Sequence, residues 1–169
     1  GTEGQPYSYT YRDGADLLND DSRDNALIYV PASQGEITLE NPSNWSALNS
    51  FIENNDYLNS RRGDYVEKNA TRGPWTDIVD LRFVQDLIVS KNKLQFTFDI
   101  FNFTNFLNQD WGRRYFVGSF GFAQPLRTVT AGPDPVFRWQ EGSDDPRITD
   151  FGFSGSRWRA QIGIRYTFK

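Results

Sequence analysis

The 169-residue sequence contains neither cysteine nor histidine. The absence of cysteine excludes disulfide bonds and thiol chemistry. The absence of histidine removes the base of Ser-His and Cys-His nucleophilic enzymes and the commonest transition-metal ligand. Carboxylate pairs remain as a source of acid–base chemistry, but no spacing in the sequence singles one out. We therefore predict that the protein is not an enzyme.

Long apolar runs and basic clusters are also lacking. No stretch of about 18 apolar residues occurs, so the sequence predicts no transmembrane helix. The net charge is −4 and the lysines and arginines are scattered, which argues against a nucleic-acid partner. Only 37% of the residues are hydrophobic, yet 16% are aromatic. This combination is typical of β-strands with one apolar face that are joined by long polar loops.

Four segments alternate apolar and polar side chains with a period of two, which indicates β-strands with unlike faces. Each is close to the length that a tilted strand needs to cross a bilayer, about 9–11 residues. The four predicted strands are residues 5–12, 76–89, 94–104 and 156–168. In the last strand, the side chains that we expect to face lipid are Trp158, Ile162, Ile164, Tyr166 and Phe168.

The connections between these strands differ sharply in length. A short polar turn, "SKNK", joins the second strand to the third, whereas long loops span residues 13–75 and 105–155. Short turns at one end and long loops at the other are typical of outer-membrane barrels. The sequence therefore predicts an all-β fold, a transmembrane antiparallel β-barrel with a periplasmic C-terminus and extracellular loops. A soluble antiparallel sandwich also alternates, and it remains an alternative.

The long loops carry structure of their own. The first should contain a short strand, "ALIYVP", stopped by Pro31. It should also contain an amphipathic helix in "SNWSALNSFIENNDYL", with Ser43 as its N-cap. The second loop should contain a hairpin formed by "QPLRTVTA" and "DPVFRWQ" around "GPDP".

Several of these motifs, taken in order, resemble a known family. The segments "DLRFVQDLIV", "LQFTFDIFNFTNFLNQDWG" and "RWRAQIGIRYTF" are similar to the end of TonB-dependent outer-membrane receptors. The segments "GQPYSYTY", "ALIYVP", "RGDYVEKNATRGPW" and "DIFNFTNFLN" resemble strand and loop signatures of the Oar-like branch, which is common in Bacteroidota. The resemblance runs nearly from end to end, and the number and order of the motifs make it specific.

The resemblance implies that the chain is the C-terminal portion of such a barrel in the bacterial outer membrane. Four strands cannot close a barrel, so we expect a longer polypeptide, with the plug domain outside this chain. The family binds and imports a large solute at the cell surface. The implied partners are outer-membrane lipid, the TonB system through the plug, the barrel-assembly machinery that reads the last strand, and a surface lipoprotein or larger outer-membrane complex. Two alternatives are an outer-membrane scaffold and a soluble carbohydrate-binding β-sandwich.

Four groups of residues are candidate sites. Polar side chains expected to face the barrel lumen, where they would form charge-paired ladders, are Asp80, Arg82, Asp86, Asp99, Arg157, Arg159 and Arg165. A predicted calcium site in the 13–25 loop comprises Asp13, Asp16, Asp20, Asp21 and Asp24. Trp75 precedes the second strand and suits an interfacial anchor. The tripeptide Arg62-Gly63-Asp64 is predicted to be a turn rather than an adhesion motif.

Overall fold

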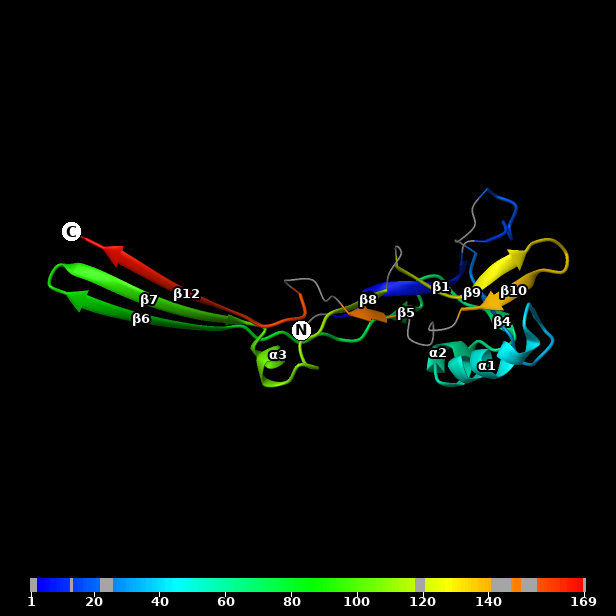
Figure 1. Cartoon of the computed structure of the whole chain (residues 1–169), viewed down its shortest axis with the longest axis horizontal. Coiled ribbons are helices and arrows are strands. Elements are labelled where there is room, and N and C mark those ends of the chain that lie inside the picture. The colour runs from blue at the N-terminus through cyan, green and yellow to red at the C-terminus, as the bar shows by residue number, and fades with distance from the viewer. Residues whose placement is uncertain are drawn as a thin grey trace. The chain divides into compact units, whose positions relative to one another are not determined.

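The computed structural model describes residues 3–12, 14–21, 26–117, 121–140, 147–149 and 155–168. The chain divides into two compact units, which are labelled in Figure 1 by their elements. Unit 1 comprises Gly1–Gly4, Pro74–Tyr115 and Thr149–Lys169. Unit 2 comprises Gln5–Gly73 and Phe116–Ile148.

Strands dominate the described residues, and the all-β prediction is confirmed at this level. The described strands form four separate sheets, and none of these sheets closes into a barrel. Within the described ranges, no helix is both long enough and apolar enough to span a membrane. Beyond the two main sheets, β2 (Tyr29–Val30) pairs with β4 (Asp64–Tyr65), and β8 (Tyr115–Val117) pairs with β11 (Arg147–Thr149).

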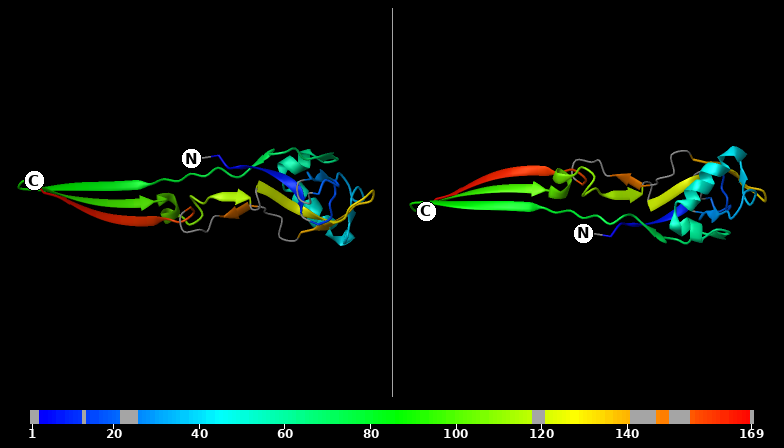
Figure 2. Two further views of the ribbon diagram at one scale, coloured as in Figure 1. Left: turned by 90° about the horizontal axis from the view of Figure 1, so that it is seen from above. Right: turned by 90° about the horizontal axis from the view of Figure 1, so that it is seen from below.

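Unit 1 is built on a three-stranded antiparallel sheet in the order β12-β7-β6, seen from two further directions in Figure 2. Its strands are β6 (Leu81–Val89), β7 (Asn92–Phe101) and β12 (Arg159–Thr167). They coincide with three of the four predicted strands. Val89 pairs with Asn92 across the predicted tight turn, where Ser90 adopts a left-handed φ of 58°.

The predicted strand 94–104 ends early, at Phe101. Asn102 has φ 53°, in the left-handed region, and the short helix α3 (Phe103–Leu107) follows it. Asp80 Oδ1 accepts a hydrogen bond from the Asn102 amide at 2.8 Å, so a side chain takes the place of a ladder partner there. The same contact lies immediately before the start of β6. Both strands are therefore shorter at this end than the alternation predicted.

Unit 2 contains a five-stranded mixed sheet in the order β3-β10-β9-β1-β5. Its strands are β1 (Pro6–Arg12), β3 (Thr38–Leu39), β5 (Thr71–Arg72), β9 (Phe122–Thr130) and β10 (Val136–Trp139). The antiparallel pair β9–β10 is the hairpin predicted around "GPDP". The central pair, β1 and β9, is parallel.

The strand predicted at residues 5–12 exists as β1, but it pairs with β5 and β9 and not with β6. All five residues from Tyr7 to Tyr11 are buried, so neither face of β1 is available to lipid. The serine and threonine between the tyrosines are hydrogen-bonded: Ser8 Oγ donates to Asn69 Oδ1 at 3.2 Å, and Gln124 Nε2 donates to Thr10 Oγ1 at 3.3 Å. Hydroxyl groups that have hydrogen-bond partners can be buried in a protein interior. The alternation of side chains alone could not predict that this polar side of β1 is buried.

Three helices that follow β3 in unit 2 cover its aromatic core. They are η1 (Pro42–Asn44), α1 (Trp45–Glu53) and α2 (Asp56–Ser60). The buried face of α1 places Phe51 against Tyr9, with ring centroids 6.1 Å apart, and against Trp139, at 5.3 Å. Each such buried side chain contributes roughly 1.5–3 kcal/mol through removal of apolar surface from water.

The helix in the first loop is confirmed, but its predicted N-cap is wrong. Ser43 lies within η1, and its amide donates to Asn41 Oδ1 at 3.2 Å. Pro42 has no backbone N–H and favours the first position of a helix, which moves the start of helical structure upstream. Asn44 occupies the position before α1 and makes no side-chain cap.

Candidate functional site: a sheet with two unlike faces

The register of β6, β7 and β12 gathers the apolar side chains on one face. Phe98 lies opposite both Phe83 and Ile162, and Leu94 lies opposite both Leu87 and Tyr166. Because directly paired residues share a face, the alternations of three strands that are distant in sequence coincide. The apolar members of this face are Leu81, Phe83, Leu87, Val89, Leu94, Phe96, Phe98, Ile100, Ala160, Ile162, Ile164 and Tyr166. We call these residues the apolar face.

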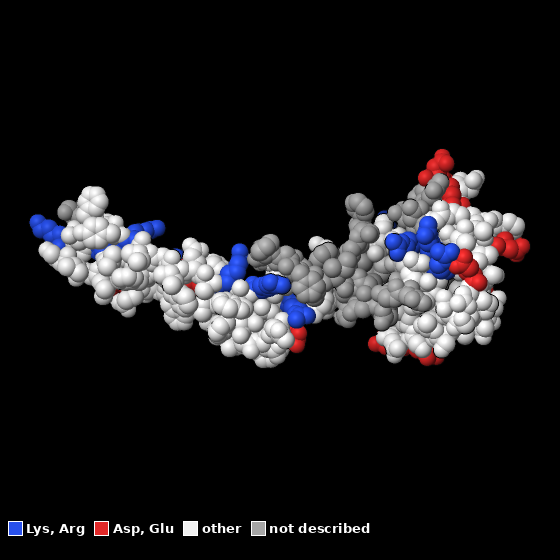
Figure 3. All heavy atoms as spheres, in the orientation of Figure 1, with Lys and Arg blue, Asp and Glu red and all other residues white. Residues whose placement is uncertain are grey.

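Much of the apolar face is exposed. Ile162 is 75% exposed, Ile164 67% and Phe83 57%. Figure 3 shows a largely uncharged surface over the part of unit 1 that carries these strands. Each large apolar side chain left in water forgoes roughly 1.5–3 kcal/mol of burial. A contiguous exposed surface of this kind marks a site that contacts a membrane or another macromolecule.

The opposite face is largely polar and internally paired. Arg82 Nε lies 3.3 Å from Asp99 Oδ1, and these residues are directly opposite in the ladder. Asp86 receives Lys93 Nζ at 2.7 Å and Gln95 Nε2 at 2.8 Å. Opposite charges on adjacent strands contribute roughly 0.2–1 kcal/mol per pair. These contacts help to hold β6 and β7 in register.

The residues predicted to face a lumen divide into two groups. The five on the polar face of the sheet are Arg82, Asp86, Asp99, Arg159 and Arg165. Arg159 also lies over the ring of Phe101, with its guanidinium carbon 5.4 Å from the ring centroid. Asp80 and Arg157 lie just outside the strands. Three apolar residues, Val84, Ile88 and Phe101, share the polar face, and Val84 and Ile88 are exposed.

Two buried asparagines organise the end of the sheet where β7 stops, and sequence reasoning missed them. Asn102 Nδ2 donates to the Gly112 carbonyl at 2.9 Å. Asn105 Nδ2 donates to the carbonyls of Gln109 and Trp111, both at 2.9 Å, and its Oδ1 accepts from the Trp158 amide at 3.2 Å. The only sequence signal was the repeated asparagine in "FNFTNFLN".

This polar network positions aromatic side chains at the same end of the sheet. Phe106 packs edge-on against Trp158, with ring centroids 5.0 Å apart. The candidate anchor Trp75 is 60% exposed, and its indole N–H donates to Asp77 Oδ1 at 2.8 Å. At the other end of β12, Tyr166 stacks on Phe168 at 6.3 Å. Aromatic rings therefore lie near both ends of β12.

The described residues contain no group of three or more side chains that could hold a metal ion. Asp16 instead accepts the backbone amides of Asp20 and Asp21, at 3.3 and 2.9 Å. Asp13 and Asp24 lie outside the described residues. The calcium site in the 13–25 loop therefore stays a prediction.

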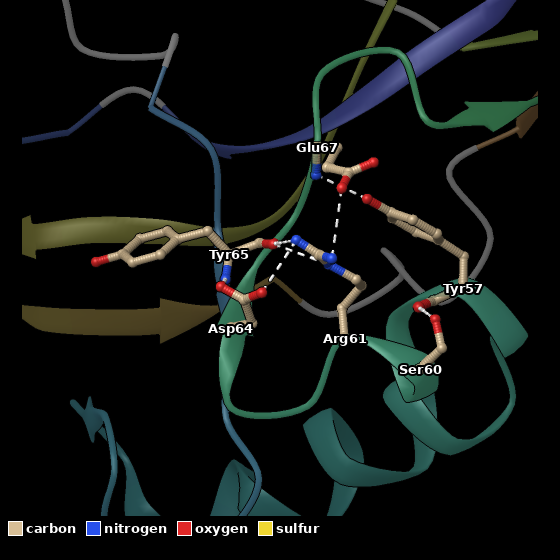
Figure 4. A network of polar contacts seen from close by, with 6 residues as sticks. All are labelled: Tyr57, Ser60, Arg61, Asp64, Tyr65 and Glu67. Atoms are coloured by element: carbon tan, nitrogen blue, oxygen red, sulfur yellow. Dashed lines mark hydrogen bonds and ion pairs between the residues drawn. The ribbon is translucent and has the colours of Figure 1, made fainter.

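The Arg62-Gly63-Asp64 tripeptide lies in a turn, as predicted. Gly63 has φ 79°, which favours glycine, and β4 begins at Asp64. Figure 4 shows how the neighbouring Arg61 organises this turn: its guanidinium donates to the Tyr65 carbonyl at 2.7 and 3.0 Å and pairs with Asp64 at 3.1 Å. The Asp64 carboxylate is thus engaged within the turn.

Comparison with family models, with curated proteins and with solved structures finds no match for this chain.

Proposed function

We propose that β6, β7 and β12 form part of the wall of an outer-membrane β-barrel, with the apolar face in lipid and the polar face toward the lumen. The observation that carries the proposal is the exposed apolar face, formed in register by three strands and opposed by a face of paired charges. On this proposal the chain is the C-terminal portion of a TonB-dependent receptor that binds and imports a large solute.

The strand lengths support a membrane wall. β6 and β12 have 9 residues each and β7 has 10, and a tilted strand of about 9–11 residues crosses the hydrocarbon core. The aromatic side chains near the strand ends suit the two interfaces, where an aromatic ring contacts lipid while its polar group stays hydrated.

The open edges of the sheet supply a second argument. In the described part of the chain β6 and β12 are edge strands, so each presents backbone N–H and C=O groups without a ladder partner. Each backbone polar group that is left unpaired in hydrocarbon costs roughly several kcal/mol of free energy. The proposal therefore requires further strands, contributed by a longer polypeptide, on both sides of this sheet.

On this proposal, chain direction distinguishes the two ends of the sheet. β6 begins, β7 ends and β12 begins at the end organised by Asn102 and Asn105. The long segments that contain unit 2 leave the sheet at this end, and we assign it to the cell surface. The tight turn after Val89 and the end of β12 then lie on the periplasmic side.

Single-cysteine labelling tests the orientation of the faces, because the chain has no native cysteine. A nitroxide label is attached along β12 of the full-length polypeptide in lipid vesicles. We expect labels at Ile162→Cys and Ile164→Cys to collide with oxygen dissolved in the bilayer. Labels at Gln161→Cys and Arg165→Cys should instead collide with a water-soluble nickel complex, and Ser33→Cys in unit 2 serves as an aqueous control. Uniform access of the nickel complex along β12 would refute the membrane orientation.

The intact mass of the detergent-extracted species tests the assignment to a larger receptor. A mass several times the 19.5 kDa of this chain, with these peptides at its C-terminal end, would support it. A mass near 19.5 kDa in a monodisperse sample without detergent would contradict it.

A further inference from the structure

Unit 2 contains a cavity of about 930 Å³ that the membrane proposal does not use. Its volume falls within the range of about 300–1,000 Å³ that is typical of small-molecule and short-peptide sites. β1, β2 and β10 contribute lining residues, as do the segments before β2, before β3 and before β10.

Aromatic rings form the apolar wall of this cavity. Tyr11 stacks on Phe137, with ring centroids 4.6 Å apart and an interplanar angle of 15°. Tyr29 meets Tyr65 edge-on at 5.4 Å. Tyr11 and Phe137 are buried in the five-stranded sheet, whereas Tyr65 is 59% exposed. Rings held in this way contact a ligand with little loss of conformational entropy.

The charge of the lining is negative. Glu36 and Asp134 line the cavity, and its described lining residues include no lysine or arginine. The Glu36 carboxylate is held by the Ala32 amide at 2.8 Å, the Ser33 hydroxyl at 3.0 Å and the Tyr29 hydroxyl at 3.1 Å. The Ala32 amide, and next the Ser33 hydroxyl, lower the pKa of Glu36, so it is ionised at neutral pH. A carboxylate accepts up to about four hydrogen bonds, so Glu36 keeps capacity for a cation.

The Tyr11 hydroxyl supplies a hydrogen-bond donor. Its oxygen accepts from the Tyr29 amide at 3.2 Å, and the side chain is only 3% exposed. In this bond Tyr11 acts as the acceptor, so its hydroxyl can also donate. A buried donor without an acceptor is costly, and an oxygen atom of a bound molecule would satisfy it.

We propose that this cavity binds a short basic peptide that carries an adjacent aromatic or aliphatic side chain. The apolar side chain packs against the tyrosines and Phe137, the cation lies near Glu36 and Asp134, and a peptide carbonyl accepts from Tyr11. The proposal concerns unit 2 alone and is independent of the membrane assignment of unit 1.

Calorimetric titration of the whole chain with acetyl-Phe-Lys-amide tests the proposal. Two comparison peptides each remove one feature: acetyl-Phe-norleucine-amide lacks the ammonium group, and acetyl-Gly-Lys-amide lacks the aromatic ring. We expect each comparison peptide to bind about fivefold more weakly than acetyl-Phe-Lys-amide, because a partly exposed ion pair or ring contact contributes binding free energy of this size. Raising the salt concentration should weaken the binding of the two lysine peptides only, because salt screens the ammonium group from the carboxylates. Equal affinities for the lysine and norleucine peptides would overturn the proposal, as would no binding.

Matched variants locate the binding. Asp134→Asn changes an exposed residue in the β9–β10 turn, and Glu36→Gln keeps an acceptor for the Ala32 amide. Each substitution should lower the affinity for acetyl-Phe-Lys-amide about two- to fivefold and leave the circular dichroism spectrum of the protein unchanged. Glu53→Gln alters an exposed carboxylate of α1 outside the cavity and should leave affinity unchanged. Equal effects of all three substitutions would also overturn the proposal. Because spin labels on β12 report on unit 1, the two proposals can fail separately.

Discussion

Placing a charge on the apolar face distinguishes a lipid-facing sheet from one that faces water. Ile162 lies near the middle of β12, opposite Phe98, and is 75% exposed. In water, Ile162→Arg forfeits only about a quarter of the side chain's burial energy, which is about 0.5 kcal/mol. At the midplane of a bilayer, arginine on the lipid face costs about 2–4 kcal/mol. The two environments therefore predict effects that differ severalfold.

Gln161→Arg is the matched control, because it places the same charge one residue away on the other face. Residue 161 pairs with Asp99, so the new guanidinium meets a carboxylate, and we expect a change within about 0.5 kcal/mol. The assay is guanidinium unfolding of the full-length polypeptide in lipid vesicles, followed by tryptophan fluorescence. A loss below about 1 kcal/mol for Ile162→Arg, or equal losses for both variants, would refute the lipid-facing assignment.

Three further predictions concern other parts of the chain. Burial raises the pKa of Tyr11 from 10.0 to about 12. The unfolded chain therefore loses this proton first, and Tyr11 should lower the free energy of unfolding of unit 2 by about 1.4 kcal/mol per pH unit between these values. Tyr11→Phe should make the slope measured by urea unfolding shallower, and parallel slopes for the two proteins would contradict the argument. Ser90→Gly should stabilise the β6–β7 hairpin by up to about 1 kcal/mol because it relieves a left-handed φ, and a lower melting temperature would count against this. Asn105→Ala should cost about 1–3 kcal/mol because it removes the three hydrogen bonds that this buried side chain makes to backbone groups. It should also speed hydrogen exchange at the Trp158 amide, and unchanged exchange would exclude the role assigned to this network.

Local patterns in the sequence were sufficient to predict the longer elements. Alternation located β6, β7 and β12, and the polar turn between β6 and β7 was recognisable from its composition. Helical spacing of apolar residues located α1, and "GPDP" marked the β9–β10 hairpin. These features depend on contacts between residues that are close in the chain, so the sequence specifies them directly.

Other features depend on contacts between distant residues. The strand β1 alternates as regularly as β12, yet it is buried on both faces because distant segments pack on it, among them α1, whose Phe51 contacts Tyr9, and the segment of Asn69, which bonds Ser8. The left-handed Asn102 ends β7 through its bonds to Asp80 and Gly112. No local sequence pattern predicted the burial of β1 or the end of β7 at Asn102.

The sequence by itself therefore determined where the longer strands lie and which side of each is apolar, because side-chain alternation is a property of a single extended segment. The tertiary structure decided which strands pair, and with them whether an apolar side is exposed, as in β12, or buried, as in β1. It also decided that Tyr11, Glu36 and Asp134 line one cavity. The physical reason is that burial and cavity formation depend on which distant segments meet, and the free energy of those contacts belongs to pairs of segments rather than to either segment alone.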